Sequence, residues 1–340
     1  MNKWTAGGAD SIYSTARFLK WWAWNLKTLD TDYPQWMLYD CNITDPDFKT
    51  KQMIKQGYIR LCSNDEVLSK LVVNDLKEIL KKHDLPCKGK KQELLDRIRN
   101  NLDIESLEIP RIYYSISNKG NEYLNKYAEI LTAEDFRQRY NITIDDYFAA
   151  KTHFGVGHSP DEILFYIFSE ELKRHTRDNN FGALRCIYFY IAKKHEADGN
   201  YVECIKYFCA ALRYDLSGLE NMNSFTFSNI GFAPALISAI RKYKDYFDNS
   251  VIAFCESLYL PRSMADIDTF CRVIDDIFND KLQTPEDYIP KDKRVYESYE
   301  TDEIWSKSAE ELEKEADELS KELGLDDDVS FDEWLNNLNK

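Results

Sequence analysis

The segment Leu71–Ile98 constrains the fold more than any other part of the chain. It reads LVVNDLKEILKKHDLPCKGKKQELLDRI, and its apolar residues recur at helical spacing on both sides of one break. These residues are Val73, Leu76, Ile79 and Leu80 before the break, and Leu94, Leu95 and Ile98 after it. At the break, Pro86 lacks an amide donor and disfavours helix at the preceding residue, while Gly89 lets the backbone turn. The pattern predicts a helix, an extended loop and a second helix, a unit so small that it needs support from its neighbours.

The same segment is positively charged in an acidic chain. Between Lys70 and Arg99 there are nine Lys or Arg and five Asp or Glu, a net charge of +4, whereas the whole chain carries −15. Lys88, Lys90 and Lys91 cluster at the expected start of the second helix, where unpaired N–H groups and the helix dipole attract anions. On spacing and charge alone, two interpretations stay open: a site for a phosphate backbone, or a solvated helix pair whose lysines keep it soluble.

A family resemblance favours the first interpretation. The stretch from about Leu68 to Asn100 resembles a SAP domain, a helix–extended loop–helix module associated with DNA binding. The matching residues are Leu71, Val73, Leu76, Lys77, Leu80, Leu85, Gly89, Lys90, Lys91, Glu93, Leu94, Arg97 and Ile98. The resemblance implies contacts between the DNA backbone and the turn Gly89-Lys90-Lys91, with Lys77, Lys81 and Arg97 as secondary candidates. Lys88 stands where the family usually has a small hydroxyl residue that caps the second helix, so we expect a weaker cap and one more charge to bind DNA.

The flanking sequences carry a broader resemblance. The stretches YPQWMLYDCNITDP, QGYIRLCSNDEVLSKL and YYSISNKGNEYLNKY are similar to SAP-containing proteins of phages and prophages of low-GC Gram-positive bacteria. This resemblance implies a location in the cytoplasm of a bacterial host, with association with a virion as a second option. It implies no particular activity.

Composition favours a mainly α-helical, intracellular protein. The chain has only 12 Gly and 9 Pro among 340 residues, and 44% of its residues are hydrophobic, enough for real cores. The start, MNKWTAGGADSIY, does not follow the layout of a signal peptide, and no uninterrupted apolar run is long enough to span a membrane. The eight cysteines lack the paired spacings of a zinc site or a disulfide framework. We therefore expect free thiols, no metal and no cofactor.

The chain is predicted to contain five regions. These are an aromatic-rich helical region at 1–65, the SAP-like module at 66–101, a strand–turn–helix with connecting helices at 102–152, a helical scaffold at 160–290 and an acidic amphipathic segment at 295–340. Five of the seven tryptophans lie in residues 4–36. Few basic residues accompany them, which disfavours a membrane-surface helix, so we interpret them mainly as core, with an assembly surface as the alternative.

The helical scaffold contains a predicted hairpin at Phe181–Tyr214. It resembles one tetratricopeptide repeat, with Tyr188, Ala192, Gly199 and Phe208 at fitting positions. No second copy of the repeat is evident, and such repeats need stacked neighbours, so an ordinary helical hairpin stays an alternative. Either hairpin offers a surface for a protein partner.

The last 46 residues change character. Residues 295–340 hold 16 acidic and 4 basic residues, a net charge of −12. The candidate partner-binding residues, at helical spacing or in a short capped helix, are Trp305, Leu312, Leu319, Leu323, Phe331 and Trp334. Three interpretations compete: a helix packed on the protein's own body, a segment offered to a partner, and a mimic of DNA. An acidic segment can also fold back over a basic patch.

No catalytic signature is present in the sequence. The Gly155-Val156-Gly157 stretch lacks the third glycine of a phosphate-binding loop, and adjacent acids such as Asp275 and Asp276 point to different sides of a helix. We expect a non-catalytic DNA-binding adaptor whose helical body binds a protein. The alternative is a protein-interaction factor, either a phage assembly component or an inhibitor of a host defence system. In that case the SAP-like module and the acidic segment would be protein-docking surfaces.

Overall fold

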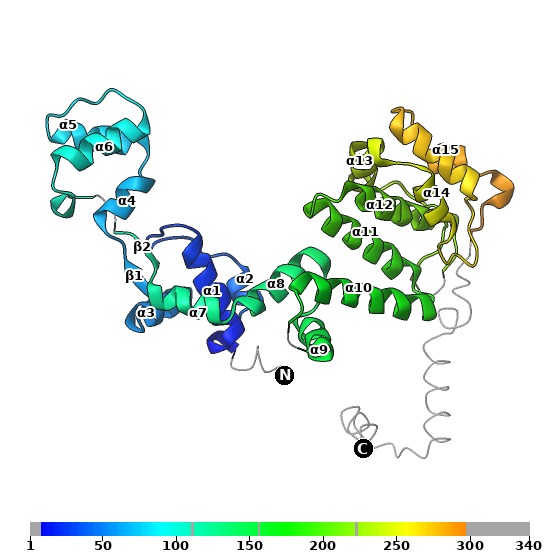
Figure 1. Ribbon diagram of the computed structural model, residues 1–340, viewed down its shortest axis with the longest axis horizontal. Helices are drawn as coiled ribbons and strands as arrows, with labels where there is room; N and C mark the ends of the chain where they lie inside the picture. Colours follow the sequence, from blue (N-terminus) through cyan, green and yellow to red (C-terminus); the bar gives the residue numbers. More distant parts are fainter. Residues whose placement is uncertain (1–7, 110–111, 156, 222–223, 297–340) are drawn as a thin grey trace, which may run out of the picture. The chain divides into compact units, whose positions relative to one another are not determined.

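The chain is mainly helical, which confirms the predicted fold class. The computed structural model describes residues 8–109, 112–155, 157–221 and 224–296 (Figure 1). The acidic amphipathic segment lies outside these residues from residue 297 onward, and with it the candidate partner-binding residues Trp305, Leu312, Leu319, Leu323, Phe331 and Trp334. The chain divides into two compact units, residues 1–167 and residues 168–340. None of the described helices is both long and apolar enough to cross a membrane.

The first unit contains a helical N-terminal part, two short strands and the predicted helix pair. Its elements are η1 (Gly8–Asp10), α1 (Ile12–Trp24), α2 (Trp36–Tyr39), α3 (Pro46–Lys55), β1 (Ile59–Leu61), α4 (Asn64–Lys70), α5 (Val73–Lys82), α6 (Lys91–Asn101), η2 (Ile104–Ser106), β2 (Tyr114–Ile116), α7 (Asn118–Lys126), α8 (Ala128–Tyr140) and α9 (Ile144–Phe154). Helix α10 (Pro160–Arg177) contains the boundary between the units.

The second unit is built from helices, among its described residues. These are α11 (Phe181–Ala197), α12 (Tyr201–Asp215), η4 (Phe227–Asn229), α13 (Pro234–Lys242), η5 (Lys244–Tyr246), α14 (Asn249–Glu256), α15 (Ile267–Phe278), α16 (Pro285–Tyr288) and η6 (Lys291–Lys293). The expected hairpin corresponds to α11 and α12. Gly199 adopts a φ of +73° between them, a conformation that glycine accepts without strain.

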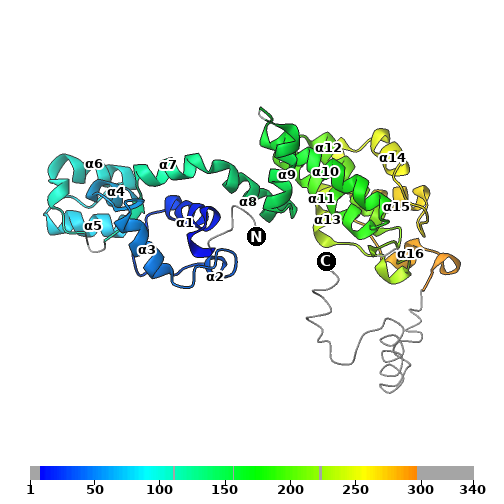
Figure 2. The ribbon, with the colours of Figure 1, turned by 90° about the horizontal axis from the view of Figure 1, so that it is seen from below.

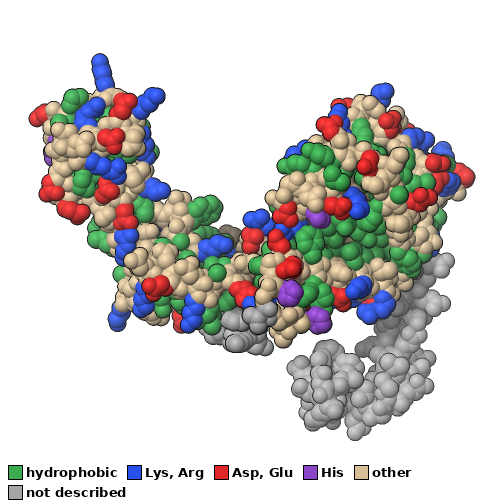
Figure 3. Space-filling view, viewed as in Figure 1, with side chains coloured by type: hydrophobic (Ala, Val, Ile, Leu, Met, Phe, Trp, Pro, Cys, Tyr) green, Lys and Arg blue, Asp and Glu red, His purple; other side chains and the backbone are tan. Residues whose placement is uncertain are grey.

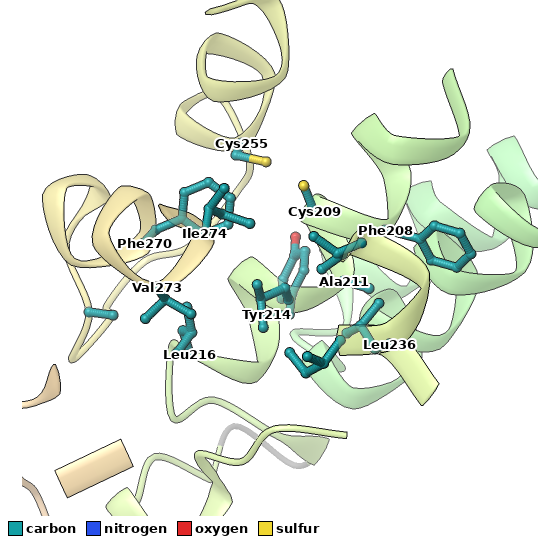
Figure 4. Close-up of a cluster of buried hydrophobic side chains, with 14 of the residues drawn as sticks. Phe208, Cys209, Ala211, Tyr214, Leu216, Leu236, Cys255, Phe270, Val273 and Ile274 are labelled. Atoms are coloured by element: carbon teal, nitrogen blue, oxygen red, sulfur yellow. The ribbon is translucent and has the colours of Figure 1, made fainter. Parts of the chain in front are cut away.

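The core of the second unit lies between α12 and the helices that follow it. Figure 4 shows Tyr214 between two groups of the same buried cluster, Phe270 and Ile274 of α15 on one side and Phe208 of α12 with Leu236 of α13 on the other. All five are essentially buried. Because α12 contributes buried residues around much of its circumference, it is the central helix of this unit.

A short sheet joins the chain on either side of the predicted SAP module. Strands β1 and β2 pair antiparallel, with Ile59 opposite Ile116 and Leu61 opposite Tyr114. Tyr114 also forms a bridge with Lys27, through an N–H···O contact of 2.7 Å from Tyr114 to the Lys27 carbonyl. The module is thus an insertion between two paired strands, and the sheet fixes both of its ends. The sequence predicted a strand near β2 but gave no signal for β1, which is only three residues long.

The helix pair has its own small core. Leu76, Leu80, Leu94, Leu95 and Ile98 are buried together with residues of α4 and the segment around η2. Figures 1 and 2 both show α5 and α6 side by side with α4 next to them. The neighbours on which the small pair was expected to depend are therefore α4 and η2.

The tryptophans near the start of the chain divide between core and surface. Helix α1 begins after Ser11, whose side chain accepts a hydrogen bond from the Ser14 amide, and ends at Trp24. Trp22 is fully buried, whereas Trp24 is 81% exposed. The interpretation of these residues as core is confirmed for Trp22 and wrong for Trp24, because the two side chains point to different sides of one helix.

A charged network crosses the interior of the same unit. The Arg17 side chain is only 6% exposed, and it contacts Asp40 at 2.8 Å and Glu134 at 3.2 Å. Arg137 contacts the same two carboxylates, at 3.0 and 2.8 Å. The Tyr13 hydroxyl donates a further hydrogen bond of 2.9 Å to Glu134. The network links α1, α8 and the residue after α2, and its two guanidinium and two carboxylate charges balance.

Candidate nucleic-acid interface

The loop between α5 and α6 is held in an extended form by both helices. Helix α5 ends where Asp84 adopts a left-handed φ of +56° and the Leu85 amide donates to the Leu80 carbonyl at 2.8 Å, a Schellman-type ending. Gly89 has a φ of +137°, which favours glycine, immediately before the second helix. The predicted helix, extended loop and helix are all present.

Arg97 fixes this loop. Its Nη1 atom donates hydrogen bonds to the carbonyl oxygens of Pro86 and Lys88, the second at 3.0 Å. From the other helix, the Lys77 carbonyl accepts from the Cys87 thiol at 3.5 Å. These contacts bring Lys77, Lys88 and Arg97 to the same stretch of loop. The sequence gave no signal for the loop contacts of Arg97.

The lysines around the loop are available to a ligand. Lys81, Lys88 and Lys90 are exposed, and Lys77 and Lys91 are half-buried. Within the described part of the chain, none of the five forms an ion pair, although carboxylates lie elsewhere on the module. Figure 3 shows Lys and Arg side chains projecting from the lobe that holds α5 and α6, with acidic side chains among them. Flexible ammonium groups without partners suit phosphate oxygens, which need no fixed geometry.

Two other basic residues of the module are already occupied. Lys82 Nζ lies 2.6 Å from Glu108 Oε2, and Arg99 Nε lies 2.7 Å from Asp65 Oδ1. The hydrogen bond from Lys82 lowers the pKa of Glu108 below its ordinary value. Both contacts tie the helix pair to flanking segments, so these two residues support the module rather than extend its binding surface.

Glu93 occupies the N-terminus of α6, where the sequence analysis expected an anion to bind. The Lys90 amide donates to Glu93 Oε2 at 3.2 Å, which places the carboxylate next to Gly89. A Cβ on Gly89 would come within 2.5 Å of that oxygen, so a larger residue there would make the carboxylate shift, while the φ of +137° is the stronger reason for a glycine. The helix N-terminus is therefore partly neutralised by the chain itself, which leaves the lysine side chains as the main attraction for phosphate.

The expectation that Lys88 weakens the helix cap is wrong. Lys90, not Lys88, occupies the N-cap position, because the extended backbone at Gly89 delays the start of α6 until Lys91. Glu93 supplies a cap from inside the helix by accepting from the Lys90 amide. Lys88 adds its charge without replacing a capping residue.

These features define a small helix–loop–helix module with a lysine-rich surface. Residues 67–103 match the family model of the SAP domain, close to the expected bounds. This domain suggests DNA binding. The match covers a small part of the 340 residues. The chain matched no curated protein and no solved structure.

The described residues show no arrangement for a metal. No group of three or more His, Cys, Asp or Glu residues in them is placed to hold an ion. His153 instead stacks on Tyr166, with ring centroids 5.2 Å apart, and His158 packs against Phe154 at 4.7 Å. These histidines belong to an aromatic cluster.

Proposed function

We propose that this protein binds duplex DNA through its SAP domain, with Lys88, Lys90 and Lys91 on the phosphate backbone and little preference for sequence. The observation that carries the proposal is the SAP match at residues 67–103, in which these lysines lack carboxylate partners among the described residues. Lys77 and Lys81 extend the surface along α5, four residues apart on one helix face. Arg97 acts by holding the loop that carries Lys88.

The test is binding of the full chain to a fluorescent duplex, measured by anisotropy and gel shift. The variant Lys88→Glu/Lys90→Glu/Lys91→Glu should weaken binding by on the order of 100-fold, because it reverses three charges that face phosphates. The matched control is Lys244→Glu/Lys281→Glu/Lys291→Glu, which makes the same change of charge at exposed lysines of the second unit. The control should bind nearly as well as the wild type. Equal loss in both variants, or loss in neither, contradicts the proposal.

We also propose that the protein is not an enzyme and that its helical second unit binds a protein, so that the SAP domain anchors an adaptor to DNA. Exposed apolar side chains support this role. Tyr201 and Val202 lie at the start of α12, and Tyr246, at the end of η5, has its ring centroid 5.4 Å from that of Tyr201. We propose in addition that α11 and α12 form a tetratricopeptide-like hairpin. We also propose that the protein originates from a phage or prophage and acts in the bacterial cytoplasm.

Cross-linking of the full chain in host cells tests the adaptor role. A partner that cross-links near Val202 should be lost from the variant Val202→Glu/Tyr246→Glu and kept by the triple lysine variant. A partner that instead depends on Lys88, Lys90 and Lys91 would favour the alternative function, in which the SAP domain docks onto a protein.

A further inference from the structure

A cavity of about 570 Å³ is lined by residues of α1, α2 and α8, and none of its described lining residues belongs to the helix pair α5 and α6. Its lining includes three tryptophans, Trp21 and Trp24 on α1 and Trp36 on α2, together with Glu134 and Gln138 on α8. The volume falls within the range of pockets for small ligands. A pocket with three indole rings takes flat or apolar groups, and its charges decide which kind.

The carboxylates of this pocket are already neutralised. Glu134 contacts Arg17 and Arg137, and Asp135 contacts Arg139 at 3.0 Å. Lys20, on the α1 wall, is exposed and forms no hydrogen bond or ion pair within the described ranges. Among the described residues that line the pocket, the charged group without a partner is therefore the ammonium of Lys20. Its positive charge favours an anionic ligand over a cationic one.

One of the three indoles has its faces open. The Trp36 ring already has the Arg17 guanidinium 4.2 Å from its centroid, and the Trp21 ring has the Lys27 ammonium at 4.4 Å. Trp24 is 81% exposed and has no ring or cation contact with the described residues. A tryptophan that exposed, beside a cavity, offers a stacking surface for a planar ring.

We propose that this pocket binds an unpaired nucleobase of single-stranded DNA, which stacks on Trp24 while its phosphate contacts Lys20. The proposal rests on the proposed function, in which the SAP domain brings DNA to the chain. An aromatic ring next to a negative charge is the chemistry of a nucleotide, and aromatic side chains bind bases of any sequence by stacking. The protein would then recognise DNA that carries a single-stranded end or gap as well as a duplex.

The test compares three fluorescent DNAs on the full chain: a blunt duplex, the duplex with a single-stranded tail of about six nucleotides, and the duplex with an abasic tail of equal length. The abasic tail has the same phosphates without bases. The wild type should bind the base-bearing tail about fivefold more tightly than the abasic tail. Trp24→Ala and Lys20→Glu should remove this difference and leave the affinity for the blunt duplex unchanged.

Matched controls are Tyr39→Ala and Lys51→Glu, exposed residues outside the pocket lining, which should keep the preference for the base-bearing tail. Thermal unfolding of each variant confirms that it is folded. Equal affinity of the wild type for the two tails, or a preference that survives Trp24→Ala, overturns the proposal. If the wild type does not bind the blunt duplex, the proposed function fails, and titration with a free single-stranded oligonucleotide still decides the pocket.

An acidic peptide with aromatic residues shares part of this chemistry, and the chain has such a sequence at Phe331–Trp334. A synthetic peptide of residues 297–340 is therefore titrated as well. The peptide carries a fluorescein label, because Trp305 and Trp334 would add to the tryptophan emission. A rise in its anisotropy with the wild type and not with Trp24→Ala, together with no binding of the oligonucleotide, would assign the pocket to a protein segment and reject a nucleobase.

Discussion

Two clusters of basic residues in the same unit illustrate how differently positive charge is used. Arg17 and Arg137 lie in a network with Asp40 and Glu134, and Arg17 is almost completely buried. The lysines around Gly89 are exposed or half-buried and have no carboxylate partner among the described residues. The comparison shows that the number of basic residues in a segment says less about its function than whether each residue has a partner. The buried position that bridges two carboxylates is an arginine, whereas the exposed positions around Gly89 are lysines, whose ammonium groups bind phosphate without a fixed geometry.

Loss of a buried partner should have the largest effect on stability. Arg17→Met removes a positive charge that balances the carboxylates of Asp40 and Glu134. It should lower the free energy of unfolding by about 3 kcal/mol, because breaking a buried ion pair leaves a buried charge without its partner. Lys90→Met removes an exposed charge and should change stability by less than about 0.5 kcal/mol. Urea unfolding followed by tryptophan fluorescence measures both. Similar changes in the free energy of unfolding for Arg17→Met and Lys90→Met would contradict the distinction between a structural arginine cluster and an unpaired lysine cluster.

The buried network should also respond to acid. Burial opposes the charged form of Glu134, but the hydrogen bond from Arg137 and the charge of Arg17 outweigh it and hold the pKa of Glu134 below its ordinary value. The pKa of Asp40 is lowered in the same way by Arg17 and Arg137 against burial. Because both values are depressed on folding, the network stabilises the protein above the ordinary carboxyl pKa of about 4 and loses this contribution as the pH falls further.

The variant Glu134→Gln isolates that effect. The difference in unfolding free energy between the wild type and this variant should be largest near neutral pH and shrink as the pH falls toward about 3. Asp135→Asn, at an exposed neighbouring ion pair, is the control and should show a small difference at every pH. A difference for Glu134→Gln that does not depend on pH would contradict the assigned role of the ion pairs.

Arg97 shares features of both kinds of basic residue. It belongs to the lysine-rich module, but its guanidinium donates hydrogen bonds to the backbone carbonyls of the loop. Arg97→Ala removes two hydrogen bonds to the loop and should cost about 1 kcal/mol of stability, together with a severalfold loss of DNA affinity. Lys81→Ala should reduce DNA affinity by a similar factor with no loss of stability. Paired measurements of anisotropy and melting temperature separate the residues. An Arg97→Ala variant that is as stable as the wild type but binds DNA more weakly would assign its guanidinium a contact with DNA instead.

Glu93 gives the smallest predicted effect, and one of opposite sign. Glu93→Gln keeps a side-chain oxygen for the Lys90 amide and removes the negative charge beside the lysines. DNA affinity should rise about threefold, with helix stability nearly unchanged. Glu78→Gln, an exposed acid on α5, controls for net charge. A gain that is equal in both variants would show that Glu93 acts only through total charge.

Local patterns predicted much of this structure. The apolar spacing of Leu76, Leu80, Leu94 and Ile98 predicted α5 and α6, and Pro86 with Gly89 predicted the loop, because helical period and backbone restrictions are properties of short stretches. The candidate residues of the module could be selected from the sequence because lysines at a helix start and their match to a family are visible in one segment.

What the sequence did not predict depends on contacts between distant segments. The pairing of Ile59 with Ile116 joins strands too short to show a periodic pattern. The salt bridges of Lys82 and Arg99 depend on Glu108 and Asp65, outside the helix pair. The pocket beside Trp24 forms only when α8 packs against α1, so the density of tryptophans indicated an unusual region without indicating its use.

The salt dependence of duplex binding tests the role of the unpartnered lysines most directly. For a site with about five phosphate contacts, one for each of the five lysines, the logarithm of the association constant should fall with the logarithm of salt concentration with a slope near −4.5. Replacing Lys88, Lys90 and Lys91 by alanine should bring the slope to about −1.8, since each lost contact removes about 0.9. A slope that stays the same in this variant would show that these lysines do not contact phosphates and would contradict DNA binding through the SAP surface.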